Sequence, residues 1–354
     1  MFQSNGLIEK FDLDVNKVKA FISHIASGYQ DNSYHNALHA ADVSQALNFL
    51  INSTRDTFQF TDVEMLGIVI AVMCHDYNHP GVNNNFLTAT MDPLAVRYNF
   101  NSVLENMHAS EAVSGLLRGN NVKTSSTSDT SLSTAATGGG EGNGCNFLSH
   151  LSREVFSDVC KVVTTIILAT DMAKHIEITS QFSAKLAAGT FDPKQKADRM
   201  AGLLIMMKFS DISNTARPWK LCEFWAHRVM NEFFEQGDKE KERGLPVSPM
   251  MDRSTDIPKC QAAFSEFVVS PLCDLVGKII PAEVYSKLSG NIKSNMSTWK
   301  SKLHSSISIT SISTSPLPPS SSSSSSSTAI LPSSTRTSHE KQRQLGSSNT
   351  TTRL

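Results

Sequence analysis

Apolar side chains recur along most of the chain at the three- to four-residue spacing of a helix that buries one face. One such stripe runs through residues 15–25, and Asp14 stands ahead of it as an N-cap. Thr61 and Glu64 form a capping box before a second apolar run, which predicts a helix starting near Asp62. Both segments therefore read as helices packed against a core.

Three further stretches extend this pattern. Residues 103–117 predict a helix of the same kind. Residues 155–170 are rich in β-branched side chains and by themselves also fit a strand, but their length and their continuation through residues 172–174 favour a buried helix. Asp192 and Pro193 supply an N-cap followed by proline at the first helical position, so another helix should open there.

The last predicted helices lead to a fold class. Residues 219–236 form a long amphipathic stretch that Gly237 should end, and two prolines stand where new helices should begin, Pro258 and Pro281. No series of alternating strands and no glycine-rich phosphate loop is found in the sequence. The core is expected to be all-α.

Two segments differ from this core in composition. Residues 119–146 are rich in Ser, Thr and Gly, and we expect a surface insertion there. From residue 304 the chain turns to Ser, Thr and Pro, so residues 304–354 should form a disordered tail outside a domain of residues 1–303. A low-complexity expansion without a role and a site of regulatory phosphorylation both remain open for the tail.

Charge and cysteine content limit the function class. Lys+Arg 32 against Asp+Glu 33 gives a formal net charge of −1, which offers no footprint for nucleic acid or for an anionic membrane. Six cysteines without a C-x-x-C pair fit a reduced compartment. No signal peptide is evident, and apolar runs such as residues 65–74 are too short to span a bilayer. We expect a soluble cytoplasmic protein.

A dense group of histidines and aspartates carries the chemistry. If residues 36–50 are helical, His35 and His39 lie on one face, and the next helix should end by turning His75 and Asp76 inward. His79 follows four residues later, and Asp211 ends the helix that Asp192 opens. The set His39, His75, Asp76 and Asp211 offers two imidazoles and two carboxylates, which suit zinc or a similar divalent cation with a position left open for water.

These residues belong to an ordered series of motifs that resembles the class I 3′,5′-cyclic nucleotide phosphodiesterases, within the HD-type metal phosphohydrolases. The motifs cover roughly residues 11–300, and they include YHNALHAADV from Tyr34, HDYNHPGVNNNF from His75, LEN from Leu104, LATDMAKH from Leu168, SDISN from Ser210, EFFEQGD from Glu232, VSPMMDR from Val247 and QAAF from Gln261. The resemblance implies a compact multi-helix bundle.

It also implies two divalent metal ions, usually zinc at a tight site and magnesium or manganese at a second. The tight site would be held by His39, His75, Asp76 and Asp211, with Asp76 bridging to the second ion. That ion would otherwise be bound largely through waters, supported by His79, Glu105 and Thr170. His35 would act as general acid and protonate the leaving 3′-oxygen.

The resemblance further implies a purine pocket. Gln261 would pair with the purine edge, since its amide both donates and accepts, and Phe264 would stack on the base opposite Val229. The same pocket would be lined by Tyr34, Met172, Asn214 and Phe233. Ignoring the family, core packing is about as good an explanation for Met172, Val229 and Phe233.

Departures from the family pattern bear on specificity. Ala263 replaces a usual glycine, Thr215 replaces a proline common in cAMP-specific members, and the chain between Asp252 and Gln261 is one residue shorter than expected. Asn214 favours cAMP, while cGMP stays open. Only 33 residues precede Tyr34, so we expect the N-terminal helices usual in the family to be shortened or absent.

The leading hypothesis is metal-dependent hydrolysis of a 3′,5′-cyclic nucleotide to the 5′-monophosphate. Another HD-type phosphohydrolase would have no need of Gln261 and Phe264. An inactive nucleotide-binding scaffold would have lost a metal ligand or the general acid. All five of those side chains are present, namely His35, His39, His75, Asp76 and Asp211. The expected partner is the cyclic nucleotide, with no nucleic acid and no membrane span, and with a homodimer left open.

Overall fold

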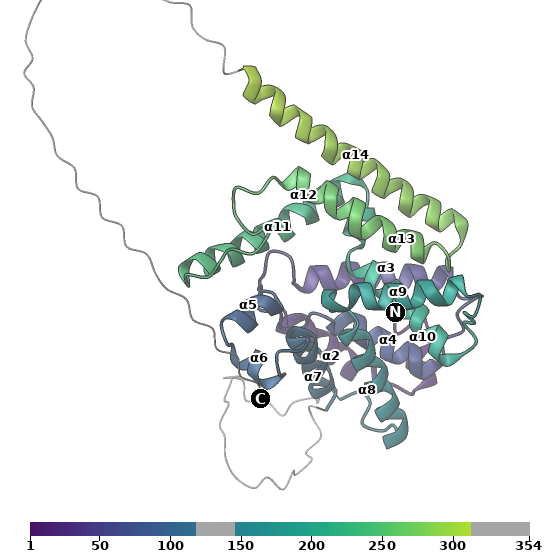
Figure 1. Cartoon of the computed structure of the whole chain (residues 1–354). Helices are drawn as coiled ribbons and strands as arrows, with labels where there is room; N and C mark the ends of the chain where they lie inside the picture. The colour runs from purple at the N-terminus through teal and green to yellow at the C-terminus, as the bar shows by residue number, and fades with distance from the viewer. Residues whose placement is uncertain (118–145, 313–354) are drawn as a thin grey trace, which may run out of the picture. The chain divides into compact units, whose positions relative to one another are not determined.

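The computed structural model describes residues 1–117 and 146–312, with side chains up to residue 303, and every regular element in these ranges is a helix (Figure 1). Residues 1–309 form one compact unit. The α-helices are α1 (Leu7–Lys10), α2 (Val15–Gly28), α3 (Ala37–Ser53), α4 (Asp62–Cys74), α5 (Asn84–Ala89), α6 (Pro93–Arg97), α7 (Val103–Leu117), α8 (Arg153–Leu168), α9 (His175–Ala187), α10 (Lys196–Asp211), α11 (Trp219–Glu242), α12 (Ile257–Phe264), α13 (Ser270–Val276) and α14 (Ala282–Ile312). Short helical turns lie between some of them, namely η1 (Met172–Lys174), η2 (Ser213–Ala216) and η3 (Ser265–Val269). The all-α prediction is confirmed.

Helix α4 lies at the centre of the core. Its residues from Leu66 to Val72 are fully buried, and it packs against α3, α7 and α8. A Cβ on Gly67 would come within 2.6 Å of Val162, so the missing side chain lets α4 and α8 approach closely. Because α4 is apolar all round, its axis is fixed by neighbours on every side. The C-terminal end of α4 is therefore held in a fixed position, and so are His75 and Asp76, which follow it.

Several helix starts and ends agree with the sequence. Asp14 caps α2, with its carboxylate accepting from the backbone N–H groups of Asn16 and Lys17. Thr61 and Glu64 form both hydrogen bonds of the predicted capping box. Helix α7 has the predicted bounds, and the stretch that also fitted a strand is helix α8.

Other boundaries differ. Helix α11 passes through Gly237 and ends at Glu242, since Gly237 serves close packing and not termination: a Cβ there would lie 1.9 Å from the carbonyl oxygen of Met251. Helix α10 begins at Lys196, after a turn in which the Asp192 carboxylate accepts from the N–H of Lys194. Helix α8 ends at Leu168, and the expected continuation is the separate turn η1.

The two low-complexity segments fall mostly outside the described ranges. The predicted insertion at 119–146 is described only at its last residue. The predicted tail begins at residue 304, whereas α14 continues to Ile312; residues 313–354 are not described. In the described ranges, no helix has the length and apolar character needed to cross a membrane.

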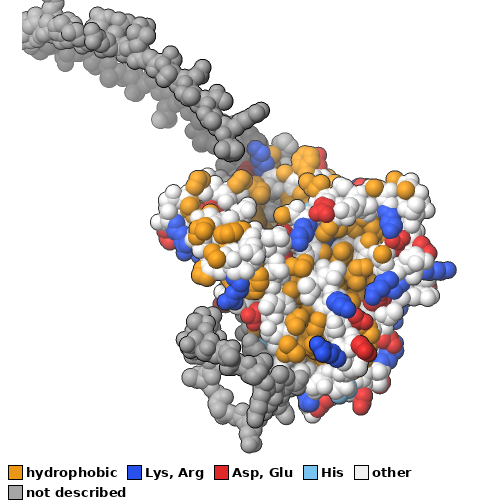
Figure 2. Space-filling view, turned by 60° about the horizontal axis from the view of Figure 1, so that its bottom comes forward, with side chains coloured by type: hydrophobic (Ala, Val, Ile, Leu, Met, Phe, Trp, Pro, Cys, Tyr) orange, Lys and Arg blue, Asp and Glu red, His pale blue; other side chains and the backbone are white. Residues whose placement is uncertain are grey.

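Surface charge matches the composition. The face drawn in Figure 2 carries Lys and Arg side chains interspersed with Asp and Glu, and apolar side chains lie between them. This mixture is what a formal net charge of −1 predicts. On this face there is no basic stripe of the kind that tracks a nucleic-acid backbone.

Candidate active site

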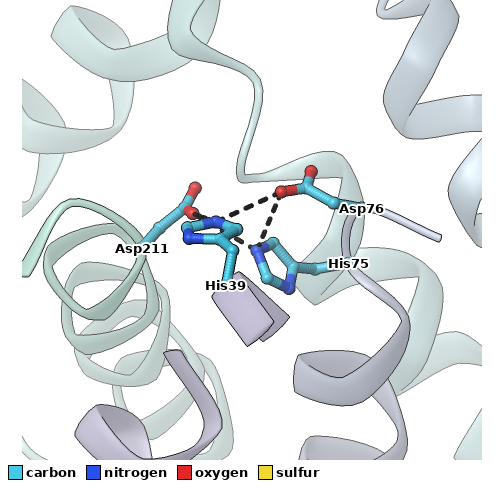
Figure 3. Close-up of side chains that lie close together, drawn as sticks. All are labelled: His39, His75, Asp76 and Asp211. Atoms are coloured by element: carbon cyan, nitrogen blue, oxygen red, sulfur yellow. Dashed lines mark hydrogen bonds and ion pairs between the residues drawn. The ribbon is translucent and has the colours of Figure 1, made fainter. Parts of the chain in front are cut away.

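The ends of three helices bring four predicted ligands together (Figure 3). His39 lies in the first turn of α3, His75 and Asp76 directly follow α4, and Asp211 is the last residue of α10. One ligand atom from each of the four lies within 4.8 Å of every other. The imidazoles of His39 and His75 are 2% and 0% exposed, so the group is closed to water on the histidine side.

The donor set fits a divalent cation. The His75 Nε2 atom lies 3.2 Å from an oxygen of Asp76 and 3.2 Å from one of Asp211, and the His39 Nε2 atom lies 3.3 Å and 3.1 Å from the same two oxygens. The other nitrogen of His75 is 2.9 Å from the carbonyl oxygen of Val72, so it carries a proton, and the neutral imidazole would present a lone pair at Nε2. Lone pairs facing carboxylates repel unless positive charge lies between them, and a metal ion supplies it.

The pKa values in this group carry the same information. Burial alone would lower the pKa of His75, but the carboxylates of Asp76 and Asp211 raise it well above its ordinary value. Burial alone would raise the pKa of Asp211, and the hydrogen bonds from His39 and His75 instead hold it below its ordinary value. Without a cation the two carboxylates favour a proton on the His75 imidazole, and a cation at the centre would take the place of that proton.

His35 lies beside this group and is held by Glu232. Helix α3 begins at Ala37 with Asn36 as its N-cap, so His35 precedes the helix and does not share its face with His39 as the sequence suggested. The Nδ1 atom of His35 forms a short hydrogen bond with the Glu232 carboxylate. That carboxylate also accepts from the backbone N–H groups of Tyr34, at 2.7 Å, and His35, at 3.0 Å. Three donors thus fix the acid and its partner in one orientation.

This pairing sets the proton affinity of His35. Burial lowers the pKa of His35, but the charge of Glu232 and its hydrogen bond more than offset this and raise it to about 9. Burial raises the pKa of Glu232, while His35 lowers it to about 2. At neutral pH the pair is an imidazolium and a carboxylate, and Nε2 is the nitrogen free to give its proton away.

A cavity of about 580 Å³ opens next to both groups. His35, Asp76 and Asp211 line it together with all three residues predicted to support a second ion, His79, Glu105 and Thr170. Burial raises the pKa of Glu105 to about 7. Its carboxylate accepts from the amide of Asn84 at 3.0 and 3.3 Å. The cavity therefore carries a carboxyl group of raised proton affinity in addition to Asp76 and Asp211.

The predicted substrate residues separate into three groups. Met172 and Phe233 line the same cavity. Phe264 lines a different hollow, together with Met250 and Ala263. Among the residues that the structure describes, Val229 and Gln261 line neither the cavity nor this hollow. Three members of the set are buried side chains, Tyr34, Asn214 and Gln261. The role of the whole set in binding stays a prediction.

Two residues that contact the predicted site side chains were not among those predicted from the sequence. Glu232 stands inside a motif that carries the family resemblance, yet its contact with His35 joins segments far apart in the chain. The Nδ1 atom of buried His108 lies 2.7 Å from the carbonyl oxygen of Tyr77, and its Nε2 atom is 3.8 Å from a carboxylate oxygen of Asp76. His108 follows the LEN motif by two residues, which was the available signal.

Comparison with known proteins places this geometry in a family. Residues 34–288 match the 3′5′-cyclic nucleotide phosphodiesterase family model. The chain is 34% identical over 302 residues to the 3′,5′-cyclic-nucleotide phosphodiesterase regA of Dictyostelium discoideum, covering 85% of this chain and 35% of that protein. It is 30% identical over 311 residues to the 3′,5′-cyclic-AMP phosphodiesterase 4C of Mus musculus, covering 86% of this chain and 42% of that protein.

A solved structure has the same fold. The phosphodiesterase domain of the Salpingoeca rosetta rhodopsin phosphodiesterase superposes with a TM-score of 0.77 at 27% identity, covering 88% of each chain. The present chain spans about a third to a half of the length of the curated relatives described above. The matched region includes every residue of the cluster described above, and the chain belongs to the 3′,5′-cyclic nucleotide phosphodiesterase family.

Proposed function

We propose that this protein hydrolyses a 3′,5′-cyclic nucleotide to the nucleoside 5′-monophosphate in a metal-dependent reaction, with cAMP the favoured substrate. One observation carries the proposal. Four side chains converge as possible metal ligands, and two of them, Asp76 and Asp211, border the same cavity as His35, whose pKa is raised to about 9. Hydrolysis of a phosphodiester needs charge neutralisation at phosphorus and a proton for the leaving oxygen, and these two groups supply both needs.

The cation sites are assigned by donor chemistry. His39, His75, Asp76 and Asp211 would hold the tight ion, for which zinc suits two imidazoles and two carboxylates. Asp76 would be shared with a second ion, magnesium or manganese, on the side of the cavity lined by His79, Glu105 and Thr170. When bound, such ions neutralise phosphate charge and lower the pKa of the attacking water.

His35 would supply the proton. Because Nδ1 is engaged by Glu232, the proton leaves from Nε2, and it goes to the 3′-oxygen as the P–O3′ bond breaks. Glu232 keeps the imidazole charged until that moment, since the carboxylate raises the pKa of His35 to about 9. An alkoxide is a poor leaving group, so this proton transfer removes a large part of the barrier.

The nucleotide base is assigned to helix α12 by family resemblance. Gln261 would pair with the purine edge, and Phe264 with Val229 would enclose the base, while Tyr34, Met172, Asn214 and Phe233 complete the pocket. Asn214 favours cAMP, and the mouse relative is named for cyclic AMP. The Dictyostelium relative is named for cyclic nucleotides without a base, which keeps cGMP as the alternative substrate.

The test is hydrolysis of cAMP and cGMP side by side by the purified protein, after chelation and re-addition of zinc with magnesium or manganese. We expect metal-dependent release of 5′-AMP in preference to 5′-GMP. Equal rates would retain the reaction and overturn the cAMP preference. No hydrolysis of either nucleotide by folded, metal-loaded protein would overturn the proposed activity in favour of a nucleotide-binding scaffold.

A further inference from the structure

One face of α11 carries three buried polar side chains, each one helical turn from the next. Glu232, Gln236 and Glu240 are 3%, 2% and 3% exposed. The spacing of four residues places them in a single row along the helix. Glu232 bonds His35, as described above. Gln236 bonds Asn83 and Glu240 bonds Ser248, and the proposed reaction assigns no role to either contact.

Gln236 is hydrogen-bonded in three directions. Its Oε1 atom accepts from the backbone N–H of Asn83 at 2.8 Å, and its Nε2 atom donates to the Asn83 side-chain oxygen at 3.1 Å. The same Nε2 group donates to a carboxylate oxygen of Glu240 at 2.8 Å. The donors to Glu240 are neutral, since Ser248 supplies the others through its backbone N–H and its hydroxyl, both at 2.7 Å. The amide of Gln236 therefore has one defined orientation, fixed from behind by Glu240.

The contact with Asn83 continues into the cavity. Asn83 is the N-cap of α5, and the next residue, Asn84, donates its amide to both oxygens of Glu105. The Asn84 side-chain oxygen also accepts from the backbone N–H of Leu104 at 2.9 Å. Asn84 thus ties α5 to the first turn of α7 by one side chain. A shift of Asn83 would move Asn84 and, with it, the carboxylate of Glu105.

We infer that Gln236 is a positioning residue for the second cation site, and that it acts through Asn83 and Asn84 on Glu105. Asn83, Asn84, Glu105 and Gln236 all line the same cavity, so the route is short and continuous. A buried amide pair of this kind stabilises little compared with apolar packing, but it specifies one geometry. The inference rests on the proposed function, because the second cation site belongs to it.

The test replaces Gln236 with leucine, which has similar volume and no hydrogen-bonding groups. The matched control is Arg199→Met, which removes a buried ion pair with Glu64 (2.9 Å) at the N-terminal ends of α10 and α4, away from the cavity. Both variants lose buried hydrogen bonds, and Arg199→Met should lose at least as much stability because it leaves the Glu64 carboxylate buried without its partner. Two readouts follow: Mn²⁺ affinity of zinc-loaded protein by electron paramagnetic resonance, and amide hydrogen exchange.

We expect Gln236→Leu to weaken Mn²⁺ binding roughly tenfold, within the range for groups that orient metal ligands. Zinc content should be unchanged. Exchange should accelerate at the amides of Asn83 and Leu104, although Leu104 does not touch residue 236. If Gln236→Leu fails to fold, Gln236→Met tests the same bonds with a more flexible side chain.

Unchanged Mn²⁺ affinity, or a shift equal to that of Arg199→Met, would overturn the inference, as would accelerated exchange at Asn83 without any at Leu104. Because neither readout depends on turnover, the inference stands or falls separately from the proposed reaction. A wild-type protein that binds Mn²⁺ but does not hydrolyse cyclic nucleotides would overturn only the proposed function.

Discussion

We call the four predicted metal ligands the metal half of the site, and the predicted base-binding residues on α12 the base half. The two halves are held in place by different parts of the fold. In the metal half, His39, His75, Asp76 and Asp211 extend from the ends of three long helices. Helix α4 is buried, α3 packs against it, and α10 packs against α3, so the ligand positions follow from the core. In the predicted base half, Gln261 and Phe264 lie on the short helix α12, which is reached through residues 243–256.

Helix α12 is anchored by local contacts. Ala262 packs with Ala226 of α11 and Trp299 of α14 in a small cluster separate from the main core. The segment that leads to α12 touches α11 where Gly237 meets the backbone of Met251. The predicted metal ligands thus lie at the ends of core helices, while the predicted base residues lie on α12, which packs against η3 and α11 and contacts the main core through Phe264. Each half should be breakable without the other.

The largest effect should come from the metal half. Replacing Asp211 with asparagine keeps the shape of the side chain but removes a charge from the cation site. Loss of the bound ion removes several kcal/mol of transition-state stabilisation, so we expect turnover to fall roughly 10³-fold or more. Elemental analysis should find the tight metal lost while circular dichroism stays native. Retained metal with normal turnover would exclude Asp211 as a ligand.

The next effect separates proton delivery from metal binding. In Glu232→Gln the amide still accepts a hydrogen bond, but the charge that holds the pKa of His35 at about 9 is gone. His35 must be protonated to act, so the high-pH limb of turnover should move to lower pH. At pH 8 we expect roughly 10²-fold lower kcat, the range of general acid catalysis, with recovery as the pH falls.

The control for this variant is Glu235→Gln, the same change at the neighbouring position on α11, where the carboxylate bonds Asn231. Its pH profile should match the wild type. Stability provides a second readout. Because the folded pKa of His35 is raised from 6.5 to about 9, the pair stabilises the fold below pH 6.5 and loses this contribution as pH rises through about 9. Glu232→Gln should lack that slope, and a slope retained in the variant would contradict the assignment.

Much of the metal half could be predicted because its signals are local. The capping box at Thr61 fixes the start of α4, and the end of that helix places His75 and Asp76 together. A cation needs a compact set of donors, so a dense group of histidines and aspartates limits the arrangement further. Asp211 alone indicates only a helix end, and its prediction as a ligand rested on the histidines and aspartate upstream, with which the family motif agrees.

The features that the sequence did not predict depend on contacts that spacing and propensity rules do not describe. The bond between His35 and Glu232 joins residues 197 positions apart, so no spacing rule reveals it. Glycine is a poor helix former, so the sequence predicts a helix end at Gly237; in the structure the helix continues, and the glycine allows the close approach of Met251. Aspartate is a favoured N-cap residue, yet the Asp192 carboxylate accepts from the backbone N–H of Lys194 within a turn, and the helix starts at Lys196.

A change on α12 tests whether the base half lies where the resemblance places it. Gln261→Ala removes an amide that would both donate to and accept from the purine. Loss of two neutral hydrogen bonds should raise KM for cyclic nucleotide roughly tenfold, with metal content intact. Gln181→Ala, at an exposed amide on α9, is the control. An unchanged KM would move the base-binding residues away from α12, and loss of metal would contradict the independence of the two halves.

The smallest effect concerns the contact that supports α12. In Gly237→Ala the new Cβ would lie 1.9 Å from the Met251 carbonyl oxygen and 2.7 Å from its carbonyl carbon, so the backbone must move. Overpacking of this kind costs about 1–3 kcal/mol. Gly290→Ala is the matched control, because that glycine lies inside α14 with nothing within 4 Å of an added Cβ.

Both substitutions gain the same helix propensity, up to about 1 kcal/mol, so the difference in unfolding free energy between them isolates the steric term. We expect Gly290→Ala to be neutral or stabilising, and Gly237→Ala to be destabilised with a several-fold higher KM and unchanged zinc content. If the two variants are equally stable, the approach of Met251 to α11 is not a support of the base half. A fall in zinc content in Gly237→Ala would instead mean that the two halves share this support, because the displaced segment would then have to act on ligands carried by the core helices.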